Sequence, residues 1–523
     1  GLGAPAAPAP GGPAAAAPPA DGELPALPVV HWLRERGGPI DRFNQHVLLT
    51  VPAGLREQPL RDALAALATR HPALRLRLDR TDGLWTQEVL AADRAPALTD
   101  PQTLRRVDTR AARSEDPTAL LTREADAAAA ALDPATGRVL RAVWFDAGPN
   151  TDGRLLLTVH HLAVDGVSWR TLLPGLRTAY EALAAGARPA LEPEAHSLRA
   201  WSEQLLAHAQ ERGRVAEARL WRDALAGPAG PLAALTADPA RDTVATLRTL
   251  RRTLPADRTE PLLTVLPQSF GAGVDDVLLA GLALGVAAAR PGAAPAVRID
   301  LEGHGRGGGE SAGLTPDLAR TVGWFTTVHP VRLDLAGLDP AEAMTGAAIT
   351  GQVLKQVKEQ LRAAPDRGLG FGLLRHLNAQ TAPLLAAVPR SEVLFNYRGR
   401  TDSGAGPQGG WPFAPQDERT AAAAGAGPDP LMAAGYPLEI DAVVQAGPDG
   451  RPELAVEWSW PGALLGDGEV AALADSWFAA LDALARHAAG GDAGGVTPSD
   501  LDLVRLKQTQ IDRLESRLRR RRR

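Results

Sequence analysis

Two adjacent histidines are the residues of this chain best suited to acid–base chemistry. His160 and His161 end a predicted strand at 154–161, and an Asp165-Gly166 turn follows. Neighbouring strand residues point to opposite faces, so we expect one imidazole to face a cavity and the other to pack inward, without sharing a metal ion. A cavity-facing imidazole titrates near neutral pH and can carry a proton. Two hydrogen-bonded core histidines are the alternative, which the Asp-Gly at this spacing disfavours.

Composition excludes several other kinds of site. The 523 residues include no cysteine, which excludes disulfides, zinc–thiolate sites and cysteine nucleophiles. Only Lys355, Lys358 and Lys507 are lysines, which disfavours a pyridoxal-phosphate Schiff base, and we expect no metal and no intrinsic cofactor. The net charge of −5 argues against nucleic-acid binding. No apolar run is long enough to span a bilayer, so we expect a cytoplasmic protein without a membrane partner.

The elements that must position these residues divide into two expected lobes. Residues 1–22 are nearly all Ala, Pro and Gly and predict a linker, and a second stretch at 184–197 predicts a connector. We expect lobes at 23–190 and 191–495, and a tail at 496–523. The periodicities predict strands at 43–51, 154–161, 245–254, 296–301, 393–397 and 454–460, and helices at 58–70, 119–132, 198–226, 275–289, 340–364 and 469–489. This mixture predicts an α/β or α+β fold.

The segment around the histidines resembles a known family. His-His-x-x-x-Asp-Gly at 160–166 is the signature of the condensation-domain superfamily of nonribosomal peptide synthetases, which resembles chloramphenicol acetyltransferase in fold. The resemblance implies two such lobes in a V-shaped arrangement, with the active-site channel between them. It also implies that His161 is catalytic and that Asp165 is structural and pairs with an arginine. The extension to Trp169 and Arg170 is similar to the epimerization branch.

Further motifs favour that branch. The Glu-Gly-His-Gly-Arg sequence at 302–306 matches a motif of epimerization domains that condensation domains typically lack. Other family-like segments occur in family order at 28–45, 276–280, 320–330, 365–372 and 395–397, with departures at Pro28–Val30, Phe371 and Arg398. The resemblance implies L-to-D epimerization of an aminoacyl or peptidyl thioester. The substrate would arrive on the phosphopantetheine arm of an upstream peptidyl carrier protein.

Such a reaction needs proton transfer on both faces of one α-carbon. His161 and Glu302 lie in different predicted lobes and could face each other across a cleft. Each well-placed proton-transfer group contributes on the order of 10²–10⁴-fold. Glu302 would need a raised pKa, which partial burial would supply. A one-base mechanism with Glu302 alone and His161 as a stabiliser stays open, as does the order of the two residues.

Two polar residues of the 395–397 segment are additional candidates. Tyr397 carries a phenol that can donate to an enolate oxygen or relay a proton, and it is the third residue that we expect to be catalytic. Its alternative is a strand tyrosine packed at a lobe interface. Asn396 either orients the substrate or closes a turn.

The remaining candidates support the site. His304 either orients Glu302 or packs, and Arg306 and Arg320 can each pair with Asp165 or Glu302. The supporting set is His160, Asp165, Gly166, Trp169, His304, Arg306 and Asn396.

The tail carries a short apolar stripe at Ile511, Leu514 and Leu518, followed by Arg519–Arg523. It predicts either a solvated helix end or an element that docks onto the next synthetase protein downstream.

Two other functions stay open for the whole chain. A condensation domain would form a peptide bond and would have no use for Glu302. An inactive carrier-docking scaffold is a third reading, which an intact His161 and Glu302 disfavour.

Overall fold

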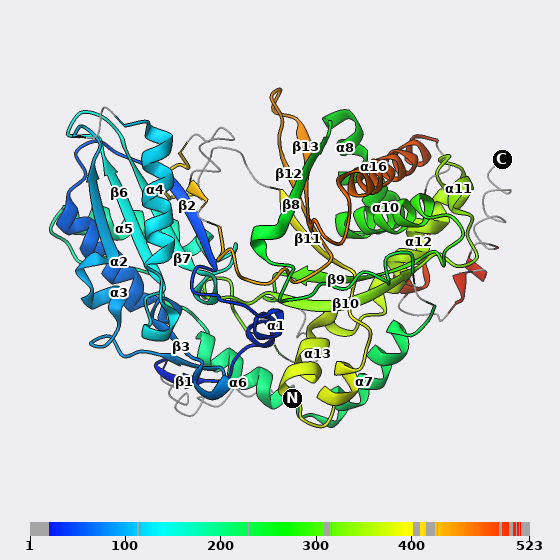
Figure 1. The fold of residues 1–523 in the computed structure, drawn as a ribbon, viewed down its shortest axis with the longest axis horizontal. Helices are drawn as coiled ribbons and strands as arrows, with labels where there is room; N and C mark the ends of the chain where they lie inside the picture. The colour runs from blue at the N-terminus through cyan, green and yellow to red at the C-terminus, as the bar shows by residue number, and fades with distance from the viewer. Residues whose placement is uncertain are drawn as a thin grey trace, which may run out of the picture.

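The computed structural model describes residues 20–513, apart from 112–114, 229, 308–313, 315, 401–407, 415–423, 426, 491–493, 502–505, 509 and 512. Most of the predicted linker at 1–22, and Leu514, Leu518 and Arg519–Arg523 of the tail, lie outside the described residues. Two lobes stand side by side as a V, with the N-terminal lobe in blue and cyan and the C-terminal lobe in green to red (Figure 1).

The N-terminal lobe is built on a four-stranded sheet with helices on both faces. Its strands, in spatial order, are β2 (Asn44–Val51), β7 (Gly153–His160), β6 (Leu140–Asp146) and β5 (Leu104–Asp108). Helices α2 (Glu57–Arg70) and α5 (Trp169–Ala184) cover one face, and α4 (Pro117–Ala130) covers the other. Leu155 and Leu157 pack in the first core, whereas Leu156 packs in the second. Burial on both faces explains why β7 is a nearly continuous apolar run.

The C-terminal lobe has a six-stranded sheet whose apolar face is covered by three helices. Its strands, in spatial order, are β10 (Thr327–Asp334), β9 (Ala296–Gly303), β11 (Val393–Arg400), β12 (Leu438–Ala446), β13 (Pro452–Pro461) and β8 (Leu247–Leu254). Helices α10 (Val274–Ala289), α12 (Ala348–Arg362) and α16 (Asp467–Ala489) pack on the apolar face. Ile299 and Phe395 point into this core, so their strand neighbours Asp300 and Asn396 point to the opposite face.

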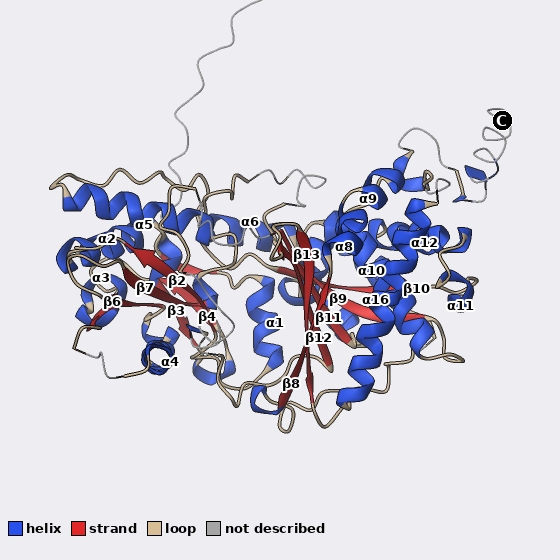
Figure 2. Cartoon of the chain, turned by 90° about the horizontal axis from the view of Figure 1, so that it is seen from above, coloured by secondary structure: helices blue, strands red, loops and turns tan. Residues whose placement is uncertain are grey.

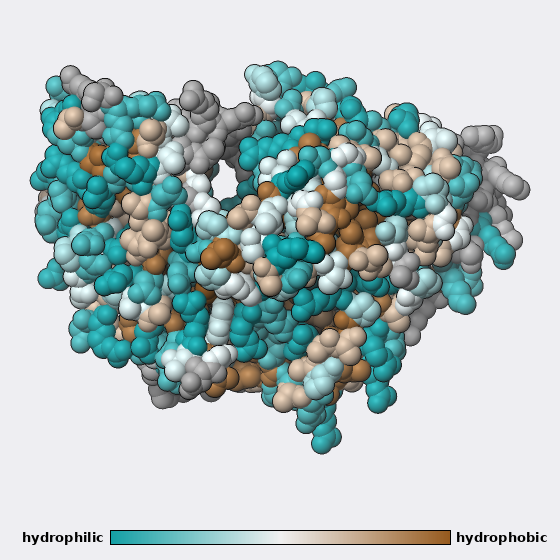
Figure 3. Space-filling view, in the orientation of Figure 1, coloured by the Kyte–Doolittle hydropathy of each residue, from teal (hydrophilic) through white to brown (hydrophobic). Residues whose placement is uncertain are grey.

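Several segments join the lobes. Helix α1 (Pro28–Arg36) lies between the two sheets (Figure 2). The chain between β11 and β12 crosses to the N-terminal lobe, where Thr50 N–H donates to the Pro412 carbonyl and Ala414 N–H donates to the Leu48 carbonyl, each at 2.9 Å. In Figure 3 an opening is visible between the lobes on this face of the molecule.

Two predicted helices are each split in the structure. The prediction at 198–226 was wrong, because α6 (Leu198–His208) ends before α7 (Arg212–Leu225) begins. Buried Arg214 holds this turn by binding His208 and Asp366. The prediction at 340–364 covers α11 (Pro340–Ala343) and α12, which Gly346 separates with a φ of 85°.

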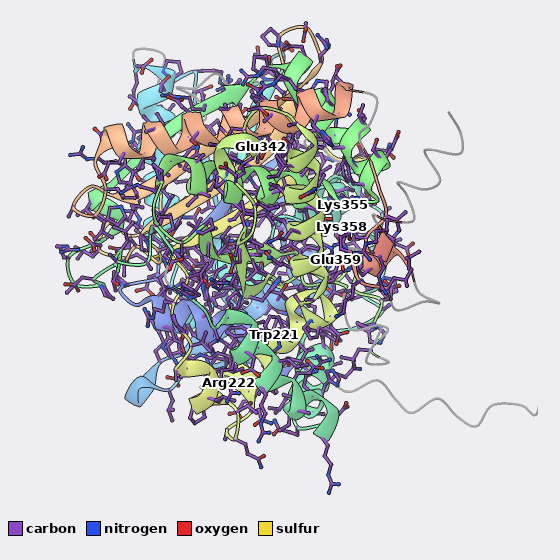
Figure 4. The ribbon with its side chains drawn as sticks, turned by 90° about the vertical axis from the view of Figure 1, so that its right-hand side faces the viewer. Trp221, Arg222, Glu342, Lys355, Lys358 and Glu359 are labelled. Carbon is purple, nitrogen blue, oxygen red and sulfur yellow. The ribbon has the colours of Figure 1, made fainter. Side chains whose placement is uncertain are left out.

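The segment after α16 folds back onto α12. Lys358, whose side chain is 1% exposed, donates to Asp500 at 2.6 and 2.7 Å and to the Phe270 carbonyl at 2.7 Å. Its neighbour Glu359 accepts from the Ser499 hydroxyl at 2.5 Å. Figure 4 shows Lys358 and Glu359 on α12, beside this C-terminal segment. Residues 497–500 therefore pack with the C-terminal lobe, beyond the boundary expected at 495.

In the described part of the chain, no single helix is long and apolar enough to cross a membrane. One bent pair, Ala256–Phe270 with Val274–Ala289, passes by length and composition. Its second helix is α10, which fills the core of the C-terminal lobe.

Candidate active site

The two histidines occupy different environments. His160 ends β7 and is fully buried, and its Nε2 lies 2.8 Å from the Ile40 carbonyl. Its Nδ1 accepts from Leu162 N–H at 3.2 Å. Burial lowers the pKa of His160 to about 3, so this imidazole is neutral. Both ring nitrogens are occupied by backbone groups, which makes His160 a structural residue.

His161 begins the short helix η5 (His161–Ala163) and lies between aromatic rings from both halves of the chain. Phe43 stacks on the imidazole at 4.8 Å between ring centroids, and Trp324 tilts against it at 4.7 Å. Burial lowers the pKa of His161 below its ordinary 6.5, so the neutral imidazole is favoured. His161 is therefore the member of the pair that the aromatic walls present between the lobes.

A glutamine fixes the tautomer of His161. The Trp169 indole N–H donates to Gln45 Oε1 at 2.8 Å, so the amide nitrogen of Gln45 points away from Trp169. That nitrogen lies 3.0 Å from His161 Nε2 and donates to it. His161 Nε2 is thus an acceptor and carries a lone pair, and the ring proton resides on Nδ1. The Gln45 amide occupies that lone pair, so His161 can take a proton at Nε2 once this hydrogen bond opens.

Trp169→Phe keeps an aromatic ring at this position but removes the indole N–H that holds Gln45. We expect about a fivefold loss of activity, because one hydrogen bond of about 1 kcal/mol no longer orients Gln45. Nitrogen-15 NMR of the imidazole should show a mixture of tautomers where the wild type shows one. A single unchanged tautomer in Trp169→Phe would contradict this role for Gln45.

A buried ion pair ties the histidine turn to the other lobe. Arg306 Nη2 donates to both oxygens of Asp165, at 2.8 and 2.9 Å, and these side chains are 6% and 7% exposed. Asp165 also accepts from the backbone and hydroxyl of Ser168, at 2.8 and 2.7 Å. The Arg306 guanidinium lies 4.4 Å above the Phe325 ring.

The sequence left open whether Arg306 or Arg320 is the partner of Asp165. In the structure Arg306 pairs with Asp165, whereas Arg320 lies 3.8 Å from exposed Glu192.

Glu302 stands near the end of β9, opposite Val328 of β10. In the described part of the chain its carboxylate has no hydrogen bond or ion pair. Burial raises its pKa to about 7, assisted by the negative charges of Asp441 and Glu439 and partly offset by Arg36 and Arg398. Those arginines are bound elsewhere, Arg36 to Glu439 at 3.0 Å and Arg398 to Asp441 at 2.9 Å. Glu302 is thus a carboxylic acid that gains and loses its proton near neutral pH.

Strand register separates the two candidates on β11. Leu394 pairs with Asp300 and Phe395 with Leu301, which places Asn396 beside Glu302 on the same face.

Tyr397 points to the opposite face, where it packs against the core beneath the helices. Burial raises the pKa of Tyr397 to about 12, so its phenol stays protonated. The structure brings Asn396 to Glu302 but does not bring Tyr397 there.

Two other predicted supports lie at the surface. His304 is exposed, and its Nδ1 accepts from Arg306 N–H at 3.1 Å, so it does not orient Glu302. Gly166 is exposed, and a Cβ there would meet no atom within 4 Å. It is therefore a turn residue without a contact to the reacting groups.

The sequence did not point to Tyr436, which lies just before β12. Its hydroxyl donates to Asp300 at 2.5 Å and accepts from the Trp32 indole at 2.9 Å. The negative charge of Glu302 contributes to the raised pKa of this phenol, after burial and Asp300. Being one of only three tyrosines was the sole available signal; its contacts join residues more than 130 positions apart.

A row of aromatic rings connects the histidine to the carboxylate. Trp324, which touches His161, lies 6.4 Å edge-to-face from Trp32, and Trp32 lies 6.4 Å from Tyr436. The negative charge of Glu302 contributes to the raised pKa of Tyr436. These rings thus form one aromatic wall from His161 to Tyr436, whose hydroxyl binds Asp300 on the strand that carries Glu302. Among the described residues, no group of three or more His, Asp or Glu side chains is arranged to hold a metal ion.

Comparison with known proteins identifies the family. The model of the condensation domain matches residues 40–409, which include both His161 and Glu302. The chain belongs to the condensation domain family. One of the linear gramicidin synthase proteins of Brevibacillus parabrevis is 34% identical over 495 residues, which cover 94% of this chain and 9% of that protein. Chondramide synthase cmdD of Chondromyces crocatus is 33% identical over 94% of this chain and 12% of that protein.

A solved structure confirms the expected fold of this condensation-family chain. The epimerization domain from the third module of tyrocidine synthetase B matches with a TM-score of 0.72 and 28% identity, over 90% of this chain and 98% of that one. The predicted pair of chloramphenicol acetyltransferase-like lobes is thereby confirmed. The chain spans only about a tenth of the length of the curated relatives it matches.

Proposed function

We propose that this condensation-family domain epimerizes the α-carbon, L to D, of an acyl group held as a thioester on the phosphopantetheine arm of a carrier protein. The observation that carries the proposal is Glu302, a carboxyl group without a partner in the described chain and with a pKa of about 7. Peptide-bond formation, the runner-up reaction, needs no such acid at this position. The domain requires no cofactor of its own, and its partner is an upstream peptidyl carrier protein.

The mechanism depends on which of His161 and Glu302 carries a proton before the reaction. The pKa of Glu302 lies above the lowered pKa of His161, so a single proton shared between them resides on Glu302. The Gln45 amide gives up its hydrogen bond to Nε2, and neutral His161 takes the α-hydrogen through that nitrogen. The C–H electron pair moves into the thioester as an enolate. Protonated Glu302 then delivers its proton to the opposite face of the α-carbon. In this mechanism the Asn396 amide, beside Glu302, donates to the enolate oxygen. Exchange with solvent returns the proton from His161 to Glu302.

This mechanism predicts that the epimerization rate falls as pH rises through about 7. Above that value Glu302 is ionised and His161 is neutral, so the pair has lost the one proton that inversion requires. The measurement is the initial rate of D-product formation between pH 5.5 and 8.5. A rate that instead rises through about 7 and levels off would identify ionised Glu302 as the only base.

One experiment separates the three candidate functions. A carrier-bound L-acyl thioester is incubated with the domain in deuterated water, with and without an acceptor aminoacyl carrier. Epimerization predicts α-deuterium in the product and a D/L mixture after hydrolysis, with or without acceptor. Condensation predicts no deuterium and a longer peptide only when acceptor is present. A carrier-docking scaffold gives neither, and either of these last two results would overturn the proposal.

A further inference from the structure

A large cavity lies between α1 and the polar face of the C-terminal sheet. Its volume is about 460 Å³. Its walls come from α1, from β9 and β10, and from the segments at 233–239, 371–376, 385–392 and 434–437. We call it the α1 cavity. Cavities of 300–1,000 Å³ typically hold ligands larger than a single side chain.

The α1 cavity adjoins the proposed acid. Asp300 lines it and precedes Glu302 by two residues on the same face of β9. Val328, also in the wall, is the direct cross-strand partner of Glu302. Two further wall residues, Arg36 and Tyr436, interact with Glu302 electrostatically. A group attached to the carbon that Glu302 protonates can therefore extend into this space.

The charges in the cavity wall are largely compensated. Glu35 binds Arg375 at 3.0 Å, Arg298 binds Glu392 at 2.5 Å, and Arg36 binds Glu439 at 3.0 Å. Paired groups of this kind offer no strong attraction to a charged ligand.

The rest of the wall mixes occupied polar groups with apolar side chains. Asp300 accepts from the hydroxyls of Ser391 and Tyr436, each at 2.5 Å. Val29, Leu235, Phe371 and Leu385 supply apolar surface. A neutral chain that alternates polar amides with side chains suits this lining better than a single ion does.

We infer that the α1 cavity holds the upstream residues of a peptidyl group, so that the substrate is a peptidyl thioester rather than a single aminoacyl thioester. The inference rests on the proposed function. The α-carbon lies between His161 and Glu302, and the preceding residues run along β9 past Asp300 toward Arg298. A single aminoacyl group would leave the α1 cavity filled with water and would make no contacts with its walls.

Filling the cavity tests the inference. Ala386 is exposed and lines the cavity, whereas its neighbour Ala387 is also exposed but does not line it. Ala386→Trp should lower the rate of α-deuterium uptake into a carrier-bound tripeptidyl thioester at least tenfold. It should leave uptake into the matching aminoacyl thioester within twofold. Ala387→Trp, the matched control, should change neither rate.

The possible outcomes are distinct. Equal losses on both substrates would mean that the carrier arm itself passes through the α1 cavity, and unchanged rates would mean that nothing binds there; each overturns the inference. Ala233→Trp, at another part of the wall, repeats the test if Ala386→Trp melts at a lower temperature. If wild-type protein introduced α-deuterium into neither substrate, the proposed function itself would be contradicted. Faster uptake into the aminoacyl thioester than into the tripeptidyl thioester would overturn only the inference.

Discussion

Glu302→Gln should abolish most D-product formation, with a loss on the order of 10²–10⁴-fold in rate. The amide keeps the size of the side chain but can neither deliver nor accept the proton at pH 7. His161→Ala should cause a loss of the same order, because the opposite face then lacks its base. The rate is measured by chiral separation of the product released from the carrier at pH 6.5.

The matched control replaces a glutamate of the same sheet that lies three strands away from Glu302. Glu457 on β13 pairs with exposed Arg251 at 2.6 Å, and Glu457→Gln should retain the wild-type rate within twofold. Carrier binding should survive in all three variants, and melting temperatures check that each variant is folded. Near-normal D-product formation by Glu302→Gln would remove the carboxylate from the mechanism.

Asp165→Ala should destabilise the protein by about 3–5 kcal/mol, because it leaves the Arg306 guanidinium buried without its counter-charge. Urea unfolding, followed by tryptophan fluorescence, gives the change in the free energy of unfolding. Activity should fall as well, since the turn that carries His161 loses its tie to the loop after β9.

An exposed ion pair provides the contrast for this second experiment. Glu457→Ala removes the partner of Arg251, whose side chain is 73% exposed, and should cost about 0–1 kcal/mol. A cost for Asp165→Ala no greater than that of Glu457→Ala would show that the Asp165–Arg306 pair does not hold the lobes together.

Local sequence patterns predicted the residues whose placement depends on strand alternation. An apolar run ending in two histidines led to the expectation of one imidazole packed inward and one facing a cavity. His160 is fully buried, and His161 lies half-buried between Phe43 and Trp324. The same alternation could not decide the orientation of Tyr397. Both faces of β11 carry apolar residues, so only the register with β9 shows which face holds Glu302.

Long-range contacts account for what the sequence could not specify. Arg306 and Arg320 are equivalent by residue type, and only the fold brings the first to Asp165, 141 positions away. Gln45 reaches His161 across the pairing of β2 with β7, and Tyr436 reaches Asp300 across the sheet. The splits near Glu211 and Gly346 likewise depend on tertiary contacts and backbone conformation rather than on periodicity.

The most direct test is a crystal structure of the domain with a carrier protein whose arm bears an unreactive amide analogue of the acyl thioester. Reacting atoms in a productive complex lie about 3–3.5 Å apart. The account predicts that the α-carbon lies between His161 Nε2 and the Glu302 carboxylate, at about that distance from each and with the two groups on opposite faces. An α-carbon that contacts only one of them, or that has both on the same face, would contradict it.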